Sequence, residues 1–127
     1  MMGKILVVDD EHIVCRGLER ILQGAGFEVD SACSGKEAIE KTKHTDYGLV
    51  FVDLVMPEMD GIETCKQLRK IAPKALIVSM TGKLDEDPIH KEIEFISAGG
   101  ISHYLYKPFA EDEILTVAKT ELGILDQ

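Results

Sequence analysis

Short apolar runs recur along the chain and alternate with segments that have helical spacing. Four of these runs, at residues 4–8, 49–52, 75–80 and 104–106, contain few polar positions and end in polar or turn-forming residues. This pattern predicts strands that are buried on both faces of a sheet. The stretch 27–32 instead alternates apolar and polar residues, which predicts an edge strand with one face in water.

Five segments show the apolar spacing of amphipathic helices. The first is the clearest and ends at Gly26. The second follows Ser34, which forms a capping-box pattern with Glu37, and the third is closed by Pro73. Pro88 is a good first residue for the fourth, with Asp87 as its cap. The apolar positions of the five helices are Val14, Leu18, Ile21, Leu22 and Ala25; Ala38 and Ile39; Ile62, Cys65, Leu68 and Ala72; Ile89, Ile93 and Ile96; and Ile114, Val117, Ala118 and Leu122.

The last two helices carry expectations that a structure can test. The fourth should turn its three isoleucines toward the core and end at Gly99 and Gly100. The last helix should end at Gly123, directly after its apolar stripe. It begins after Ala110, which has no side-chain oxygen for a cap, so Glu111 and Asp112 can support it only through the helix dipole. We therefore expect this helix to have a weak start.

Strand and helix thus alternate five times, with short loops between them. Such alternation produces a parallel sheet covered by helices on both faces, so the predicted fold class is doubly wound α/β. The chain has no internal repeat, low-complexity tract or linker. We expect one domain over residues 1–127, with no output domain in this chain.

The composition agrees with one ordinary folded domain. Of the 127 residues, 45% are hydrophobic and 29% are charged, and a domain of this size buries a core without needing disulfides or a structural metal. The 23 acidic residues outnumber the 14 basic ones, so the formal net charge is -9. This charge repels nucleic acid phosphates and anionic membranes, so neither is an expected partner.

The cysteines Cys15, Cys33 and Cys65 are odd in number and widely spaced, which suits neither a zinc site nor a disulfide framework. We expect reduced thiols that are buried or half-buried in a cytosolic protein. The apolar run Ile5–Val8 stops at acidic residues. No signal peptide or membrane span is predicted, and the expected location is the cytoplasm.

Candidate functional residues follow the predicted strands. Ligands of an open parallel sheet bind beyond the carboxyl ends of its strands. Asp9 and Asp10 follow the first strand, and the other strand-end residues are Asp53 in the third strand, Thr81 in the fourth and Lys107 after the fifth. We expect these three carboxylates, a hydroxyl and an ammonium group to converge at one edge of the sheet.

Each of these residues has an ordinary explanation when it is taken alone. Asp9 or Asp10 could cap the first helix, and Thr81 and Lys107 could be a strand-end hydroxyl and a solvated charge. Asp53 is harder to explain in this way, because it follows a buried apolar strand, where an unpaired carboxylate is costly. It needs a partner or a cation.

The convergence of the residues predicts a metal site that supports phosphoryl transfer. Three carboxylates in one cleft repel one another unless a cation binds there. Oxygen ligands without a nearby His or Cys suit Mg2+ or Mn2+ rather than zinc. A carboxylate nucleophile, a metal and donors for the phosphoryl oxygens are what phosphoryl transfer requires, and Asp53 would be the nucleophile.

The ordered set of these residues resembles the receiver domains of two-component response regulators, including the chemotaxis-regulator type. The motifs that carry the resemblance cover nearly the whole chain: Val7–Glu11, Asp53–Gly61, Thr81 with Gly82, and Lys107–Phe109. The resemblance implies a flavodoxin-like fold, with five helices around a five-stranded parallel sheet in the strand order 2-1-3-4-5.

The resemblance also implies a role for each site residue. Asp53 would accept a phosphoryl group from the phosphohistidine of a histidine kinase or a histidine phosphotransfer protein. Asp10 would bind Mg2+ directly and Asp9 through water, and Asp53 itself and the backbone carbonyl of Val55 would complete the protein ligands. The remaining roles belong to Lys107 and Thr81, which would bind phosphoryl oxygens, and to Tyr104, which would move inward with Thr81 as a switch.

Partners follow from the same resemblance. The switch would change the face formed by the fourth helix, the fifth strand and the fifth helix, which would meet a downstream protein effector. Phosphorylation-dependent homodimerisation is a further implied outcome. Catalysis would be limited to the domain's own phosphorylation and its slow reversal, as in bacterial-type phosphorelay signalling.

Three other functions fit the same fold class. A metal-dependent phosphatase with an aspartyl nucleophile typically carries a second Asp two residues later, where this chain has Val55. A flavodoxin-like flavin carrier needs a phosphate-binding loop after the first strand, where Asp9, Asp10 and Glu11 would repel the phosphate. A receiver-like scaffold that works by protein contacts alone also stays open, although the complete acceptor set argues against it.

Overall fold

The computed structural model describes residues 3–81, 88–101, 104–106 and 110–123, without the side chains at positions 88, 89, 104 and 106. The predicted cap Asp87 and the predicted site residue Lys107 lie outside the described residues. For Tyr104, the description is limited to the backbone.

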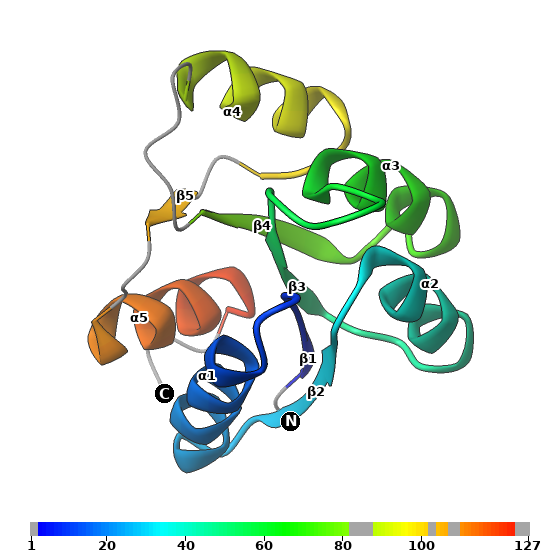
Figure 1. Cartoon of the computed structure of the whole chain (residues 1–127). Helices are drawn as coiled ribbons and strands as arrows, with labels where there is room; N and C mark the ends of the chain where they lie inside the picture. The colour runs from blue at the N-terminus through cyan, green and yellow to red at the C-terminus, as the bar shows by residue number, and fades with distance from the viewer. Residues whose placement is uncertain (1–2, 82–87, 102–103, 107–109, 124–127) are drawn as a thin grey trace.

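All the strands belong to one parallel sheet, in the order β2-β1-β3-β4-β5 (Figure 1). The predicted edge strand, β2, lies at one edge of this sheet. At the other edge, β5 pairs with β4 from Ser79 opposite Tyr104 to Thr81 opposite Tyr106. The strands are β1 (Lys4–Val8), β2 (Glu28–Ala32), β3 (Leu49–Asp53), β4 (Leu76–Thr81) and β5 (Tyr104–Tyr106).

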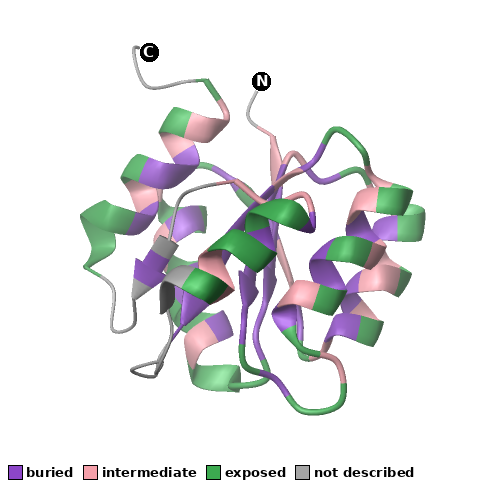
Figure 2. Cartoon of the chain, turned by 90° about the horizontal axis from the view of Figure 1, so that it is seen from above, coloured by how far each residue is buried: buried purple, intermediate pink, exposed green. Residues whose placement is uncertain are grey.

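Helices cover both faces of the sheet, which confirms the predicted α/β class. Helices α1 and α5 pack on one face, and α2, α3 and α4 pack on the other (Figures 1 and 2). The bounds of the helices are α1 (His12–Gly24), α2 (Gly35–His44), α3 (Gly61–Ile71), α4 (Pro88–Ser97) and α5 (Glu111–Glu121). Among the described residues, no helix is long and apolar enough to cross a membrane.

The central strands are apolar throughout because their side chains feed two separate cores. In β3, Leu49 and Phe51 join the core under α1 and α5, whereas Val50 and Val52 join the core under α2, α3 and α4. All four side chains are almost completely buried. A strand covered on both faces therefore needs apolar residues at every position.

The predicted capping box at the start of α2 is confirmed in modified form. The Ser34 hydroxyl accepts a hydrogen bond of 3.1 Å from the backbone N–H of Glu37. The Glu37 carboxylate accepts one of 2.7 Å from the N–H of Cys33, one residue earlier than a standard capping box requires. The first interaction satisfies a backbone donor that the helix itself leaves without a partner.

The prediction that Ile93 and Ile96 of α4 face the core is wrong, and the side chain of Ile89, the third predicted position, lies outside the described residues. Ile93 is 57% exposed and Ile96 is 42% exposed, whereas Phe95 and Ala98 are buried in the core. The Phe95 ring lies so close to Gly100 that a Cβ atom at position 100 would collide with it. Aromatic packing against this glycine, on the same core as Cys65 of α3, determines which side of α4 faces inward.

Two smaller expectations also need correction. The start of α5 is not supported by the helix dipole alone, because the Glu113 carboxylate accepts a 3.0 Å hydrogen bond from the N–H of Ala110. Of the three free thiols, Cys15 and Cys65 are buried as expected, but Cys33 is exposed. Its position directly after the edge strand β2 explains this exposure.

Candidate functional site

Three carboxylates meet where β1 and β3 end. The oxygens of Asp9, Asp10 and Asp53 that could hold a metal ion all lie within 4.8 Å of one another. Sheet register produces this cluster. Val8 of β1 lies opposite Val52 of β3, and in each strand the next residue is an aspartate, Asp9 or Asp53. Asp9 is fully buried and Asp53 is 4% exposed, whereas Asp10 is exposed to solvent.

Local hydrogen bonds orient the two buried carboxylates. One oxygen of Asp9 accepts a 2.9 Å hydrogen bond from the backbone N–H of Glu11, and one oxygen of Asp53 accepts a 3.1 Å bond from the N–H of Val55. Each is an Asx turn, in which a side chain bonds to its own backbone two residues later. The capping explanation for Asp9 or Asp10 is wrong, since Glu11 is the N-cap of α1.

The loop after Asp53 is held tightly to the sheet. The N–H of Leu54 donates to the carbonyl of Met80 at 2.9 Å, and the N–H of Gly61 donates to the carbonyl of Leu54 at 3.0 Å. A Cβ atom at position 61 would lie 2.7 Å from the Cα atom of Leu54. Glycine at the first position of α3 therefore allows this helix to approach the backbone beside Asp53 closely.

The same loop contains one residue with an unusual backbone. Glu58 has φ of 68°, which L-residues rarely adopt. The N–H of Met59 donates to the carbonyl of Pro57 across it, at 2.8 Å. A hydrogen bond that spans a single residue with positive φ is typical of a classic γ-turn, which is rare and strained. The loop reverses the chain sharply next to the carboxylates.

Thr81 lies at the same end of the sheet, where the strands reach their carboxyl ends. Asp53 is paired with Met80 in the β3–β4 register, and Thr81 follows as the last residue of β4. Its side chain is 2% exposed. The structure therefore brings Asp9, Asp10, Asp53 and Thr81 to the same edge, as the sequence predicts.

Cys15 lies directly below the cluster and was not predicted to take part in it. Its thiol donates a 3.4 Å hydrogen bond to the backbone carbonyl of Asp9. Burial, assisted by the negative charge of Asp9, raises the pKa of the Cys15 thiol to about 12. The thiol therefore stays protonated at neutral pH and serves neither as a nucleophile nor as a metal ligand.

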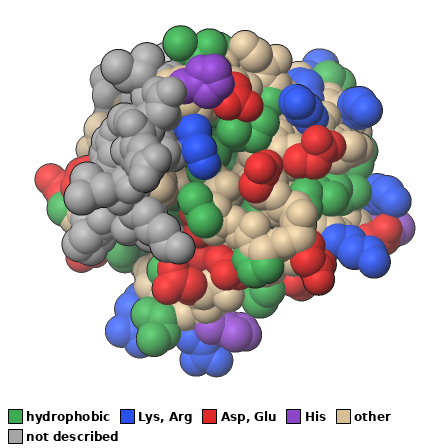
Figure 3. Space-filling view, turned by 45° about the horizontal axis from the view of Figure 1, so that its top comes forward, with side chains coloured by type: hydrophobic (Ala, Val, Ile, Leu, Met, Phe, Trp, Pro, Cys, Tyr) green, Lys and Arg blue, Asp and Glu red, His purple; other side chains and the backbone are tan. Residues whose placement is uncertain are grey.

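The donor set fits a hard divalent cation. All three side chains offer carboxylate oxygens, and their mutual repulsion at this separation favours the binding of a positive ion. Acidic side chains gather near the centre of the face shown in Figure 3, while most of its basic side chains lie around the edge. Because Asp10 is exposed, an ion held here would keep part of its water shell.

Sequence reasoning found the acidic residues but missed the residues that support them. Gly61 and Cys15 were assigned no role at the site. The signal for Gly61 was present, because Asp60 and Gly61 follow the strand-end loop and begin a helix. No sequence signal placed Cys15 under Asp9, because that contact depends on how α1 packs over β1.

Comparisons with known proteins agree with this arrangement. Residues 5–119 match the family model of the response regulator receiver domain. The transcriptional regulatory protein ResD of Bacillus subtilis is 38% identical over 94% of this chain, which spans 48% of that protein. The chain thus covers about half the length of this curated relative.

Solved structures show the same fold. Chemotaxis protein CheY4 of Vibrio cholerae aligns with a TM-score of 0.86 and 29% identity, covering 96% of this chain and 100% of that one. A response regulator of Burkholderia pseudomallei, solved with a phosphorylated aspartic acid and a calcium ion, aligns with a TM-score of 0.82 and 26% identity. That alignment covers 95% of this chain and 69% of the other.

The chain belongs to the response regulator receiver domain family of two-component systems. Domains of this family are signalling domains rather than conventional enzymes.

Proposed function

We propose that residues 1–127 form one receiver domain, which takes a phosphoryl group onto Asp53. The observation that carries this proposal is the cluster of Asp9, Asp10 and Asp53 at the carboxyl ends of β1 and β3. A buried acceptor, hydrogen-bonded in one orientation beside two further carboxylates, matches the requirements of metal-assisted phosphoryl transfer. The Burkholderia pseudomallei relative, with its phosphorylated aspartic acid, supports the assignment.

The reaction is an in-line displacement at phosphorus. A carboxylate oxygen of Asp53 attacks the phosphoryl group of a phosphohistidine on a histidine kinase or a histidine phosphotransfer protein. The new P–O bond forms as the P–N bond breaks, and the leaving imidazole takes up a proton. The Val55 N–H holds one oxygen of Asp53 and so fixes the orientation of the carboxylate for the attack.

The metal in this proposal is Mg2+, or Mn2+ in its place. Asp10 and Asp53 would bind it directly, Asp9 through water, and the backbone carbonyl of Val55 would complete the protein ligands. When bound, the ion neutralises charge on the carboxylates and on the transferred phosphoryl group.

Thr81 and Lys107 are the proposed partners of the phosphoryl oxygens. The Thr81 hydroxyl would donate to one oxygen, and the ammonium group of Lys107 would pair with another. This pairing would favour a second conformation in which Tyr104 moves inward. The backbone of Tyr104 lies in β5, beside β4, the strand that carries Thr81.

The proposed partners are proteins. A histidine kinase or phosphotransfer protein would deliver the phosphoryl group, and a downstream effector would bind the face formed by α4, β5 and α5. A homodimer that forms on phosphorylation is a further proposal for the same face. The proposed location is the cytoplasm, where such kinases present their phosphohistidines.

Intact-mass spectrometry after incubation with acetyl phosphate and Mg2+ tests this function. One phosphoryl adduct is expected on the wild type, none on Asp53→Asn and none when EDTA removes the metal. Asp46→Asn, which makes the same change at an exposed position, should behave as the wild type. An adduct on Asp53→Asn would contradict the acceptor assignment. No adduct on the wild type, even from a phosphorylated kinase, would favour the scaffold function.

A further inference from the structure

The side chain of Arg69 joins the carboxyl ends of α3 and α4, which are neighbours on one face of the sheet (Figure 1). It lies in the last turn of α3. Its guanidinium group donates to the backbone carbonyls of Ala72 at 3.3 Å, Pro73 at 2.8 Å and Gly99 at 2.6 Å. The first two carbonyls directly follow α3, and the third lies two residues beyond α4. One planar group with several donors therefore connects the two helix ends.

Gly99 suits this contact in two ways. Its φ of 106° is one that residues with a side chain rarely adopt, and a Cβ atom added there would lie 2.8 Å from Nε of Arg69. A second contact lies beside the first, because the thiol of Cys65, one turn earlier on α3, donates to the carbonyl of Ala98 at 3.6 Å. Side chains of α3 thus hold two successive carbonyls at the end of α4.

The chain after α4 is also held to the rest of the core. The N–H of Gly100 donates to the carbonyl of Phe95 at 3.0 Å, and that of Ile101 donates to the carbonyl of Ile77 in β4 at 2.9 Å. The Phe95 side chain is fully buried. These contacts fix the carboxyl end of α4 to both α3 and the sheet.

The amino-terminal half of α4 has weaker anchoring. None of the described side chains from His90 to Glu94 is buried, and Ile93 is 57% exposed. His90 and Glu94 lie 3.0 Å apart, but that contact stays within the helix. Few buried apolar contacts give a segment a low local stability. A tilt of α4 about its carboxyl end therefore disrupts fewer contacts than a shift of the whole helix.

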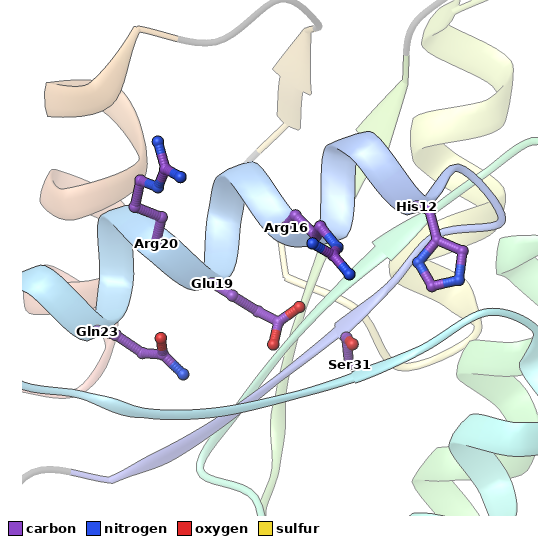
Figure 4. A pocket seen from close by; sticks show the side chains of 6 residues that line it. All are labelled: His12, Arg16, Glu19, Arg20, Gln23 and Ser31. Atoms are coloured by element: carbon purple, nitrogen blue, oxygen red, sulfur yellow. The ribbon is translucent and has the colours of Figure 1, made fainter.

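Arg16 of α1 shows that an arginine of this chain need not have such a role. It is exposed and lies beside a groove between α1 and β2 that polar residues line (Figure 4). Its guanidinium group forms neither a hydrogen bond nor an ion pair with any residue that the structure describes. The same substitution at positions 16 and 69 therefore separates the loss of an arginine from the loss of the contact between α3 and α4.

We propose that Arg69 is a positioning residue that holds the carboxyl end of α4 against α3, so that α4 pivots about Gly99 and Gly100 when Asp53 is phosphorylated. The inference rests on the proposed function, which requires the face that contains α4 to change. A pivot needs a fixed end and a few residues whose backbone dihedral angles can change. Arg69 fixes the end, and the two adjacent glycines supply the adaptable backbone.

Two-dimensional NMR spectra of the full chain test the pivot. Beryllium fluoride with Mg2+ serves as a stable mimic of the phosphoryl group, and amide shifts are compared with and without it. In the wild type, the changes along α4 should be largest before Phe95 and smallest from Ala98 to Ile101. In Arg69→Met, which loses the donors, the changes should extend through Ile101. Arg16→Met should behave as the wild type, and Arg69→Lys, which keeps one donor group, should be intermediate.

Amide hydrogen exchange without beryllium fluoride tests the contact by itself. Exchange at Gly99, Gly100 and Ile101 should be about tenfold faster or more in Arg69→Met than in the wild type. The amides of β1 and β3 report global unfolding and should change less, which separates a local effect from a general loss of stability. Arg16→Met should keep the wild-type rates.

Three results would overturn the proposal. These are shifts of equal size along the whole of α4 in the wild type, wild-type exchange rates at the two glycines in Arg69→Met, and equal effects of Arg69→Met and Arg16→Met. Failure of the proposed function gives a different result, because the amides of Asp53 and Val55 would then not respond to beryllium fluoride in any variant. The phosphorylation-driven pivot would fail with it, while the exchange rates would still measure the contact of Arg69.

Discussion

Ser79 is a buried residue whose hydroxyl lacks a hydrogen-bond partner. It lies in the middle of β4, it is fully buried, and its Oγ is the only such side-chain atom in the part of the chain that the structure describes. An unsatisfied buried hydroxyl costs about 1 to 3 kcal/mol of stability. Ser79→Ala should therefore raise the free energy of unfolding by about 1 kcal/mol, as measured by urea denaturation.

Thr64 provides the matched control for Ser79. It is also fully buried, but its hydroxyl donates a 2.8 Å hydrogen bond to the carbonyl of Asp60. Thr64→Val replaces this hydroxyl with a methyl group and should lower the free energy of unfolding by about 1 kcal/mol. Equal destabilisation by the two changes would show that Ser79 is satisfied in solution.

Buried thiols make the stability of the protein sensitive to alkaline pH. Burial raises the pKa of Cys15 from 9.0 to about 12 and that of Cys65 to about 11. In the unfolded chain each thiol loses its proton near pH 9, while in the folded chain it keeps it. The free energy of unfolding should therefore fall as pH rises above about 9, by up to about 1.4 kcal/mol per pH unit for each thiol.

Urea denaturation between about pH 8 and pH 11 measures this dependence. Cys15→Ala should show a shallower decline than the wild type, whatever its stability at neutral pH. The slope is the diagnostic quantity, because Tyr47 adds to the decline at the alkaline end, where burial and its hydrogen bond to Asp30 raise the pKa of its hydroxyl. Identical slopes for the wild type and Cys15→Ala would contradict the prediction.

At the scale of elements, the approach of α3 to β3 depends on Gly61. An added Cβ atom would collide with the backbone of Asp53 and Leu54 rather than with a flexible side chain. Gly61→Ala should therefore displace the start of α3, lower the free energy of unfolding by about 2 kcal/mol and slow phosphorylation of Asp53. Urea denaturation and the acetyl phosphate reaction measure the two effects.

Gly17 in α1 is the opposite case and serves as the control. It is exposed, and a Cβ atom added there would meet nothing within 4 Å. Because alanine is the better helix former, Gly17→Ala should raise the free energy of unfolding by about 0.5 to 1 kcal/mol. If Gly61→Ala stabilised the protein in the same way, this result would contradict the steric conflict expected between a Cβ atom at position 61 and the backbone of the acceptor loop.

At the scale of the whole molecule, the fold places like charges together at the carboxyl ends of its strands. Asp9 is fully buried beside Asp10 and Asp53. Asp9→Asn removes one charge and keeps an oxygen for the N–H of Glu11. Without divalent cations it should raise the free energy of unfolding by an amount on the order of 1 kcal/mol.

Mg2+ should reverse the order of stability of the wild type and Asp9→Asn. An ion that binds the folded chain alone stabilises it, so the thermal midpoint of the wild type should rise with Mg2+ concentration. Asp9→Asn should gain less from the ion, whereas Asp46→Asn, an exposed control, should follow the wild type. A thermal midpoint that is independent of Mg2+ in the wild type would argue against the proposed metal site.

Most of the fold could be predicted because its signals are local. The cap Ser34 is defined by a few neighbouring residues and lies where α2 begins. The face of α4 could not be predicted, because Ile93, Phe95 and Ile96 are all apolar and helical spacing does not rank them. The space above Gly100 decides that Phe95 faces inward.

The same division holds for the site. Asp53 could be identified because a carboxylate at the end of a buried strand is costly, and Asp9 and Asp10 because they also follow a strand. Their mutual distance depends on register, which no local pattern encodes.

The sequence by itself determined the α/β class, most element ends and the identity of the strand-end carboxylates, because propensity, capping and apolar spacing act over a few neighbouring residues. Tertiary structure alone decided which side of α4 is buried and how closely Gly61 approaches the acceptor loop. These features depend on contacts between residues far apart in the chain, where steric fit and strand register determine the outcome.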